Sequence, residues 1–210
     1  MKFNCVNTKH GCTATLPEND LKDHESECFF RLVPCPHPAR GACLEKVIFR
    51  DVIQHYETVH EKMEKENVSE TISLSLNDIG VSGKGCYTGP QKFCVKNRVF
   101  LLSGKTQSLI RYRWLQLLGS PNEAKHFSYT LKYFGENVTN TFEGKVASID
   151  DTCRGVLDAG KYFAYPQSDF VSQFMDKNGE LKVSLKIRNL KEEAKDENYE
   201  SGISEDDDEK

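Results

Sequence analysis

The sequence has no long apolar run: none approaches the roughly 20 residues of a membrane-spanning helix, and no apolar segment follows Met1. We therefore expect neither a membrane anchor nor a signal peptide. The chain also lacks a basic excess. Its formal charge is −4, residues 191–210 carry ten acidic groups against three lysines, and the remainder is close to neutral. Nucleic-acid-binding domains are usually strongly basic, so nucleic acid is not an expected partner.

Cysteine is the unusually frequent residue. Five of the eight cysteines alternate with histidines in the first sixty residues. This arrangement favours zinc-bound thiolates in a reducing compartment over disulfides. We therefore expect the protein in the cytoplasm, with the nucleus as a second location. The other cysteines, Cys86, Cys94 and Cys153, are expected to be small core residues.

Two consecutive sets of four side chains have the order and spacing of zinc ligands. Intervals of six, eleven and three residues separate the first set, and seven, eleven and four separate the second. The sets are Cys5, Cys12, His24, Cys28 and Cys35, Cys43, His55, His60. A tetrahedral zinc site takes four such ligands from two chain segments. The repeated spacing predicts two structural zinc ions with closed coordination, and it supplies no catalytic residue.

The last two ligands of each set are predicted on a helix. Residues 17–20, Pro-Glu-Asn-Asp, form a helix-start signal. His24 and Cys28 then share one helical face, because they lie four residues apart. A second helix is predicted over residues 49–60, where the interval between His55 and His60 is looser by one residue.

Two further histidines lie inside the cysteine–cysteine loops. His10 and His37 have no counterpart at the same place in the other set. We expect neither to be a ligand, although His37 remains the more serious rival because it follows Cys35 by two residues.

The composition divides the chain into four parts. Residues 1–62 hold the double zinc unit, whose small size requires the metal to supply much of its folding free energy. Residues 63–70 are a polar connector, and residues 71–190 form the main domain. Residues 191–210 have almost no apolar content and are expected to be a disordered acidic tail.

Alternating apolar residues predict a series of short strands after residue 70. They cover residues 72–76, 93–102 with a turn near Asn97, 111–118, 127–133, 137–149 and 181–187. A glycine-rich loop is predicted over residues 80–90. Short alternating strands separated by Gly, Pro, Asn and Asp indicate an all-β antiparallel sandwich. Its aromatic stripes are expected to be core.

The double set resembles the SIAH-type zinc finger of the seven-in-absentia (SINA/SIAH) family. Residues 117–131, from Leu-Leu-Gly-Ser to Phe-Ser-Tyr-Thr-Leu, are similar to a stretch of that family's TRAF-like sandwich, as are residues 177–181. The resemblance spans roughly residues 5–187. It implies a zinc-bound α+β double finger followed by a TRAF-like sandwich. It also implies peptide binding, homo- or heterodimerisation through the sandwich, and a role in ubiquitin-dependent degradation.

The sequence departs from that family in three places. The family's ubiquitin ligases carry a RING domain, and this sequence contains no Cys-x-x-Cys from which a RING is built. We therefore expect the chain alone to be inactive as a ligase, and a RING-containing relative is a candidate partner. The loop between Cys35 and Cys43 is one residue longer than usual. Residues 80–92 match loosely, so ligand preference has shifted or the groove is lost.

Three residues are candidates for the peptide site that the resemblance implies. Leu74, Leu76 and Tyr87 flank the place of the family's groove, and each is equally compatible with a core role. Two functions remain open: substrate recognition for a ubiquitin ligase, or a RING-less adaptor that competes with full-length relatives. A DNA-reading finger fits less well, because such fingers place only two to four residues between their cysteines.

Overall fold

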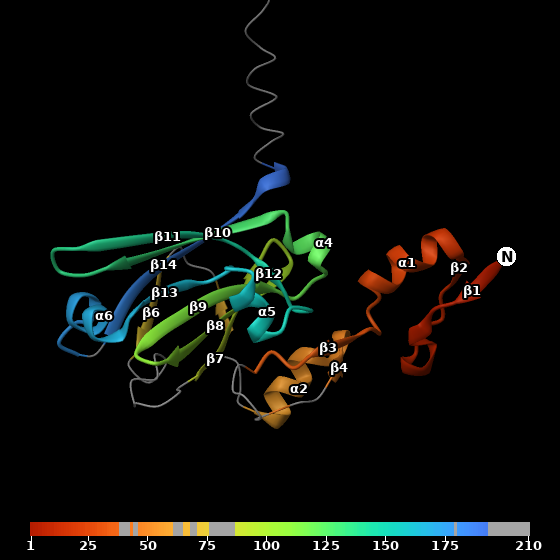
Figure 1. Ribbon diagram of the computed structural model, residues 1–210, viewed down its shortest axis with the longest axis horizontal. Helices are drawn as coiled ribbons and strands as arrows, with labels where there is room; N and C mark the ends of the chain where they lie inside the picture. The colour runs from red at the N-terminus through yellow and green to blue at the C-terminus, as the bar shows by residue number, and fades with distance from the viewer. Residues whose placement is uncertain are drawn as a thin grey trace, which may run out of the picture.

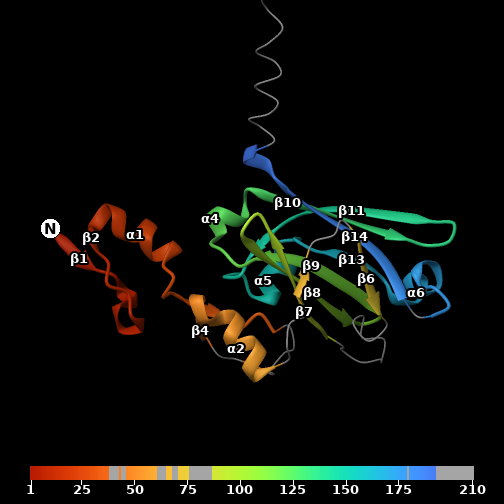
Figure 2. The ribbon, with the colours of Figure 1, turned by 180° about the vertical axis from the view of Figure 1, so that it is seen from behind.

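The computed structural model describes residues 1–37, 43, 46–60, 65–67, 71–75, 87–178 and 180–192. Two small units precede a β-sandwich (Figure 1). The first unit lies at one end of the molecule, and the second lies between it and the sandwich, as the view from behind confirms (Figure 2). In the described residues, no helix has the length and apolar character needed to cross a bilayer.

The first unit is a hairpin followed by a helix. Its elements are β1 (Lys2–Asn4), the 3-10 helix η1 (Val6–His10), β2 (Thr15–Pro17) and α1 (Glu18–Glu27). The predicted start of α1 is correct, because Pro17 caps it and Glu18 and Asp20 occupy its first turn. Gly11 ends η1 with φ +106°, a conformation that favours glycine.

The second unit repeats this plan. Its elements are β3 (Leu32–Pro34), β4 (Lys46–Ile48), the 3-10 helix η2 (Phe49–Asp51) and α2 (Val52–Val59). The helix predicted over residues 49–60 therefore begins with a 3-10 turn. It ends at Val59, so His60 is the residue that caps α2.

The first sheet of the sandwich has the order β12-β9-β8-β7-β5, and β13 also pairs with β9. Its strands are β5 (Lys65–Asn67), β7 (Tyr87–Val95), β8 (Arg98–Gln107), β9 (Ile110–Leu117), β12 (Ala147–Ser148) and β13 (Phe163–Pro166). The predicted turn near Asn97 joins β7 and β8, where Lys96 and Asn97 have positive φ. Gly89 and Pro90, predicted in a loop, lie at a register shift within β7.

The second sheet is antiparallel throughout, with the order β11-β10-β14-β6. Its strands are β6 (Thr71–Ser75), β10 (Phe127–Phe134), β11 (Thr139–Lys145) and β14 (Glu180–Asn189). The helices α4 (Pro121–Ala124), α5 (Cys153–Asp158) and α6 (Gln167–Phe174) connect strands and were not anticipated.

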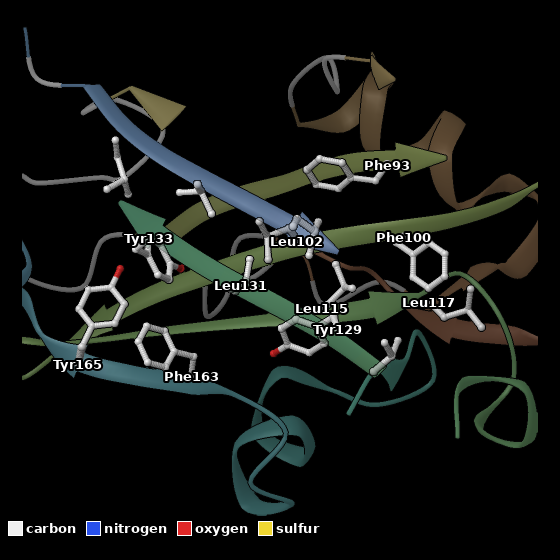
Figure 3. Close-up of a cluster of buried hydrophobic side chains, with 14 of the residues drawn as sticks. Phe93, Phe100, Leu102, Leu115, Leu117, Tyr129, Leu131, Tyr133, Phe163 and Tyr165 are labelled. Atoms are coloured by element: carbon white, nitrogen blue, oxygen red, sulfur yellow. The ribbon is translucent and has the colours of Figure 1, made fainter. Parts of the chain in front are cut away.

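The main core lies between the two sheets (Figure 3). Tyr129, Leu131 and Tyr133 alternate along β10 and are fully buried, as a period of two requires. They face residues of the other sheet such as Leu102 and Leu115. The expectation that the aromatic stripes are core is confirmed for these tyrosines.

A second core joins the second unit to the sandwich. Its buried residues are Val33, Phe49, Val52 and Tyr56 from the unit and Leu101 and Ile149 from the sandwich. Arg31 reinforces this junction with an ion pair to Asp150, at 3.2 Å between Nε and Oδ1. The second unit and the sandwich therefore share one apolar core.

The first unit has its own small cluster, built from its cysteines with Ala14, Leu21 and Phe30. The two units meet mainly at the linker, where the rings of Phe29 and Phe49 are 5.7 Å apart and Arg50 lies over Phe30. Ser120 also donates a 3.3 Å hydrogen bond to Glu27. The two zinc units therefore contact each other mainly at the linker, and the second unit packs on the sandwich.

The two described thiols outside the zinc sets are less buried than the core residues they were expected to be. Cys94 is exposed, because it alternates with buried Phe93 and so points away from the core. Cys153 is partly buried at the start of α5. Cys86 and most of the acidic tail lie outside the described residues.

Candidate functional site: two metal centres

The first centre gathers four donor atoms from three segments. Cys5 caps η1, Cys12 follows Gly11, His24 lies on α1 and Cys28 caps its end. The four donor atoms lie within 4.8 Å of one another. Cys5 Sγ is 3.9 Å from Cys28 Sγ, and Cys12 Sγ is 3.4 Å from His24 Nε2.

The second centre has the same plan. Cys35 follows β3, Cys43 precedes β4, His55 lies on α2 and His60 caps that helix. Cys35 Sγ lies 3.2 Å from His60 Nε2 and 3.3 Å from His55 Nε2. Cys43 Sγ lies 3.5 Å from His55 Nε2, and all four donor atoms again lie within 4.8 Å of one another.

These distances fit tetrahedral zinc. Bond lengths of about 2.3 Å to sulfur and about 2.0–2.1 Å to nitrogen place ligand atoms about 3.8 Å apart for two sulfurs and about 3.6 Å apart for sulfur and nitrogen. The observed separations of 3.2–3.9 Å are close to these values. Soft sulfur and imidazole donors suit zinc, and each quartet is complete, so both centres are structural zinc sites.

Hydrogen bonds support the thiolates of the first centre. The backbone N–H of Asn7 donates to Cys5 Sγ at 3.4 Å, and its side-chain amide donates at 3.6 Å. Phe30 N–H donates to Cys28 Sγ at 3.4 Å. A backbone hydrogen bond from Ala14 lowers the pKa of Cys12 to about 7. Such donors favour the thiolate form that binds zinc and offset its excess negative charge.

The two rival histidines are not members of either quartet. His10 belongs to neither cluster. His37 instead stacks on His60, with ring centroids 4.3 Å apart and an interplanar angle of 22°. The Tyr56 ring contacts both imidazoles, with its centroid 5.1 Å from that of His60 and 5.9 Å from that of His37. His37 and Tyr56 therefore hold the imidazole of a ligand in place.

Sequence reasoning missed the contacts that tie α2 to β7. Glu57 Oε1 lies 3.2 Å from Lys92 Nζ, and the Lys92 side chain is only 8% exposed. A Cβ on Gly89 would lie 2.7 Å from the Tyr56 hydroxyl, so only glycine allows α2 this close. The helix α2, which carries His55, is therefore fixed to β7 of the sandwich.

The candidate peptide residues lie on strands of different sheets. Leu74 is in β6, the outer strand of its sheet, in register with Leu181. Tyr87 is the first residue of β7, opposite Lys105, and the outer side of β7 pairs with β5 at residues 92–94. Leu76 lies outside the described residues.

Two family models match the chain. The Sina zinc finger matches residues 1–73, and the Sina TRAF-like domain matches residues 85–186. The first match contains both metal centres, and the second contains most of the sandwich.

Curated relatives match most of the chain, and the match covers less than two thirds of their own length. The E3 ubiquitin-protein ligase sina of Drosophila melanogaster is 25% identical over 191 residues, 89% of this chain and 59% of the fly protein. The E3 ubiquitin-protein ligase siah-1 of Caenorhabditis briggsae is 25% identical over 202 residues, 90% of this chain and 44% of the worm protein. The Xenopus laevis siah2 ligase is 21% identical, covering 88% and 59% respectively. With its paired zinc centres, its sandwich and these matches, the chain belongs to the seven-in-absentia (Sina) family.

Proposed function

We propose that this chain is a substrate-recognition module of ubiquitin-dependent degradation, which binds extended segments of target proteins. Both metal centres have four protein ligands, so neither offers the open position that a catalytic zinc needs. The relatives named above are E3 ubiquitin-protein ligases, but the chain spans only part of their length. Recognition is the part of that activity that a sandwich of this kind supplies.

The observation that carries this proposal is the outer position of β6. Among the described residues, Thr71–Ser75 pairs with β14 on one side and has no strand on the other. The backbone groups of such a strand can accept an added strand from a partner. Among the described strands, the outer side of β7 pairs with β5 at residues 92–94, and we propose that a ligand pairs with the segment of β7 that starts at Tyr87.

A peptide library displayed on phage tests this proposal. We expect the purified chain to select extended peptides, and the double change Leu76→Ser with Tyr87→Ser to abolish their binding. Leu109→Ser is the matched control, because Leu109 is 77% exposed on the turn between β8 and β9. Circular dichroism checks that each variant is folded. Unchanged binding by a folded double variant would contradict the proposed groove.

The adaptor function remains the alternative, and partner identity separates the two. A recognition module should co-purify from cells with a RING-containing relative and with ubiquitin conjugates. An adaptor should co-purify with peptide-bearing partners only. We also propose that the sandwich forms homo- or heterodimers, and that the protein acts in the cytoplasm and the nucleus, where zinc-bound thiolates stay reduced.

A further inference from the structure

The two metal centres differ in how far solvent reaches their sulfur atoms. In the first centre Cys5, Cys12 and Cys28 are 2%, 4% and 2% exposed. In the second centre Cys35 and Cys43 are both partly exposed. An oxidant in solution must touch a thiolate to react with it, so exposure favours reaction at the second centre.

The net charge of the two centres favours reaction at the first centre instead. Three thiolates give the first centre a net charge of −1 with Zn²⁺, whereas two thiolates leave the second centre neutral. The extra charge makes sulfur more nucleophilic, but the N–H donors at Cys5 and Cys28 withdraw part of it. Burial keeps the oxidant from touching the sulfur atoms, and a more negative charge does not change that. Solvent exposure of the sulfur atoms therefore decides which centre reacts first.

The thiols of both centres are close enough to form a disulfide, so exposure decides which centre reacts. Cys35 Sγ and Cys43 Sγ lie within 4.8 Å of each other, against about 2.05 Å in a disulfide. Cys35 also lines a cavity of about 20 Å³ together with Trp114 and Cys153. A cavity of this size holds about one water molecule, and hydrogen peroxide is only slightly larger.

We propose that the second zinc centre is a redox switch, in which hydrogen peroxide converts Cys35 and Cys43 to a disulfide and releases zinc while the first centre stays loaded. One thiolate attacks peroxide, which breaks the O–O bond and gives a sulfenic acid and hydroxide. The other thiolate attacks that sulfur, forms the S–S bond and expels a second hydroxide. Two thiolates lose two electrons and peroxide gains two. The disulfide has no thiolate left for the metal.

The shared core carries this change to the sandwich. When zinc leaves, His55 and His60 no longer anchor α2 to the metal. This helix is the one that contacts β7 through Tyr56 and Glu57. It also covers Leu101 and Ile149. Oxidation of the second centre should therefore loosen the sandwich, whereas loss of the first centre should not.

Peroxide titration of the full, reduced and zinc-loaded chain tests the proposal. A chromogenic chelator measures released zinc, and peptide mapping by mass spectrometry locates disulfides. We expect release of one zinc ion out of two and a Cys35–Cys43 disulfide, with the three cysteines of the first centre still reduced. Trp114, the only tryptophan, should change its fluorescence as zinc leaves, and thiol reductant with zinc should reverse the change.

Two variants make the outcome specific. Cys153→Ser should respond like the wild type, because Cys153 is not the second thiol of the pair. Cys43→His keeps a zinc-binding side chain but removes that thiol, so it should hold its zinc at peroxide concentrations that empty the wild-type site. If Cys43→His does not load two zinc ions, disulfide mapping of the wild type decides alone. Zinc loss from the first centre first or at the same rate, or a disulfide to Cys153, would overturn the proposal.

Discussion

Loss of zinc should affect the sandwich very differently at the two centres. Cys43→Ser removes a ligand of the second centre, whose unit buries Leu101 and Ile149 of the sandwich. Cys12→Ser removes the matching ligand of the first centre, and in the described part of the chain one side-chain hydrogen bond, from Ser120 to Glu27, joins that unit to the sandwich. A structural site's binding energy is folding energy, so each variant should unfold its own unit.

The expected magnitude follows from the shared core. Leaving a buried Leu or Ile exposed costs about 1.5–3 kcal/mol each, so Cys43→Ser should destabilise the sandwich by about 3–6 kcal/mol. For a domain of this size that corresponds to a fall in melting temperature of about 10–25 °C. Cys12→Ser should cost the sandwich less than about 1 kcal/mol, the net value of one hydrogen bond.

Tryptophan fluorescence measures this directly. Trp114 is 1% exposed and lies in β9, so its emission reports unfolding of the sandwich, and far-ultraviolet circular dichroism checks that the transition is not confined to the second unit, whose Cys35 lines the same cavity as Trp114. Urea unfolding of the two variants and the wild type gives the three free energies under identical conditions. Equal stability of Cys12→Ser and Cys43→Ser would refute the argument, because the shared core would then contribute nothing.

Three further predictions concern single features of the chain. Glu57→Gln should destabilise the protein by about 1–2 kcal/mol, because the buried ammonium of Lys92 loses its carboxylate partner while solvent reaches the 37% exposed Glu57 side chain and screens the pair, and Lys92→Met in the same background should recover part of that loss in urea unfolding. Asn7→Ala should weaken zinc binding at the first centre about 10-fold through loss of the side-chain donor to Cys5, as measured by competition with a chelator, while the second centre is unchanged. The 210-residue chain should form no polyubiquitin with activating and conjugating enzymes alone; vigorous chain formation would show that it carries its own catalytic surface.

The metal centres were predictable because their determinants are local. Ligand spacing places each pair on a hairpin or a helix, and the helix-start signal before Glu18 fixed the position of His24. The turn at Asn97 and the alternation along β10 were predictable for the same reason. In each case a few neighbouring residues decide the conformation.

The shared core was not predictable, because it depends on which elements meet. Leu101 and Leu102 follow each other in β8 and are both buried. Leu102 faces the other sheet, and Leu101 faces the second zinc unit. A strand covered on both faces loses the alternation that reveals a single core. The role of Tyr56 was hidden likewise, since its contact with Gly89 joins segments that are distant in sequence.

Two buried arginines also escaped sequence reasoning. Arg111 and Arg113 alternate with Tyr112 and Trp114 in β9, a pattern that assigns the arginines to solvent. Both are 1% exposed, and β13 pairs with β9 at these positions, with Phe163 opposite Arg113 and Tyr165 opposite Arg111. The strand β13 was not predicted, so the burial of this part of β9 could not be predicted either.

Metal content per chain is the most direct test of the two structural centres. Native mass spectrometry of protein purified without chelators resolves the number of bound zinc ions in each molecule. Two ions in the wild type, and one in each of Cys12→Ser and Cys43→Ser, is the predicted result. A folded wild-type chain that holds one zinc ion or none would contradict it.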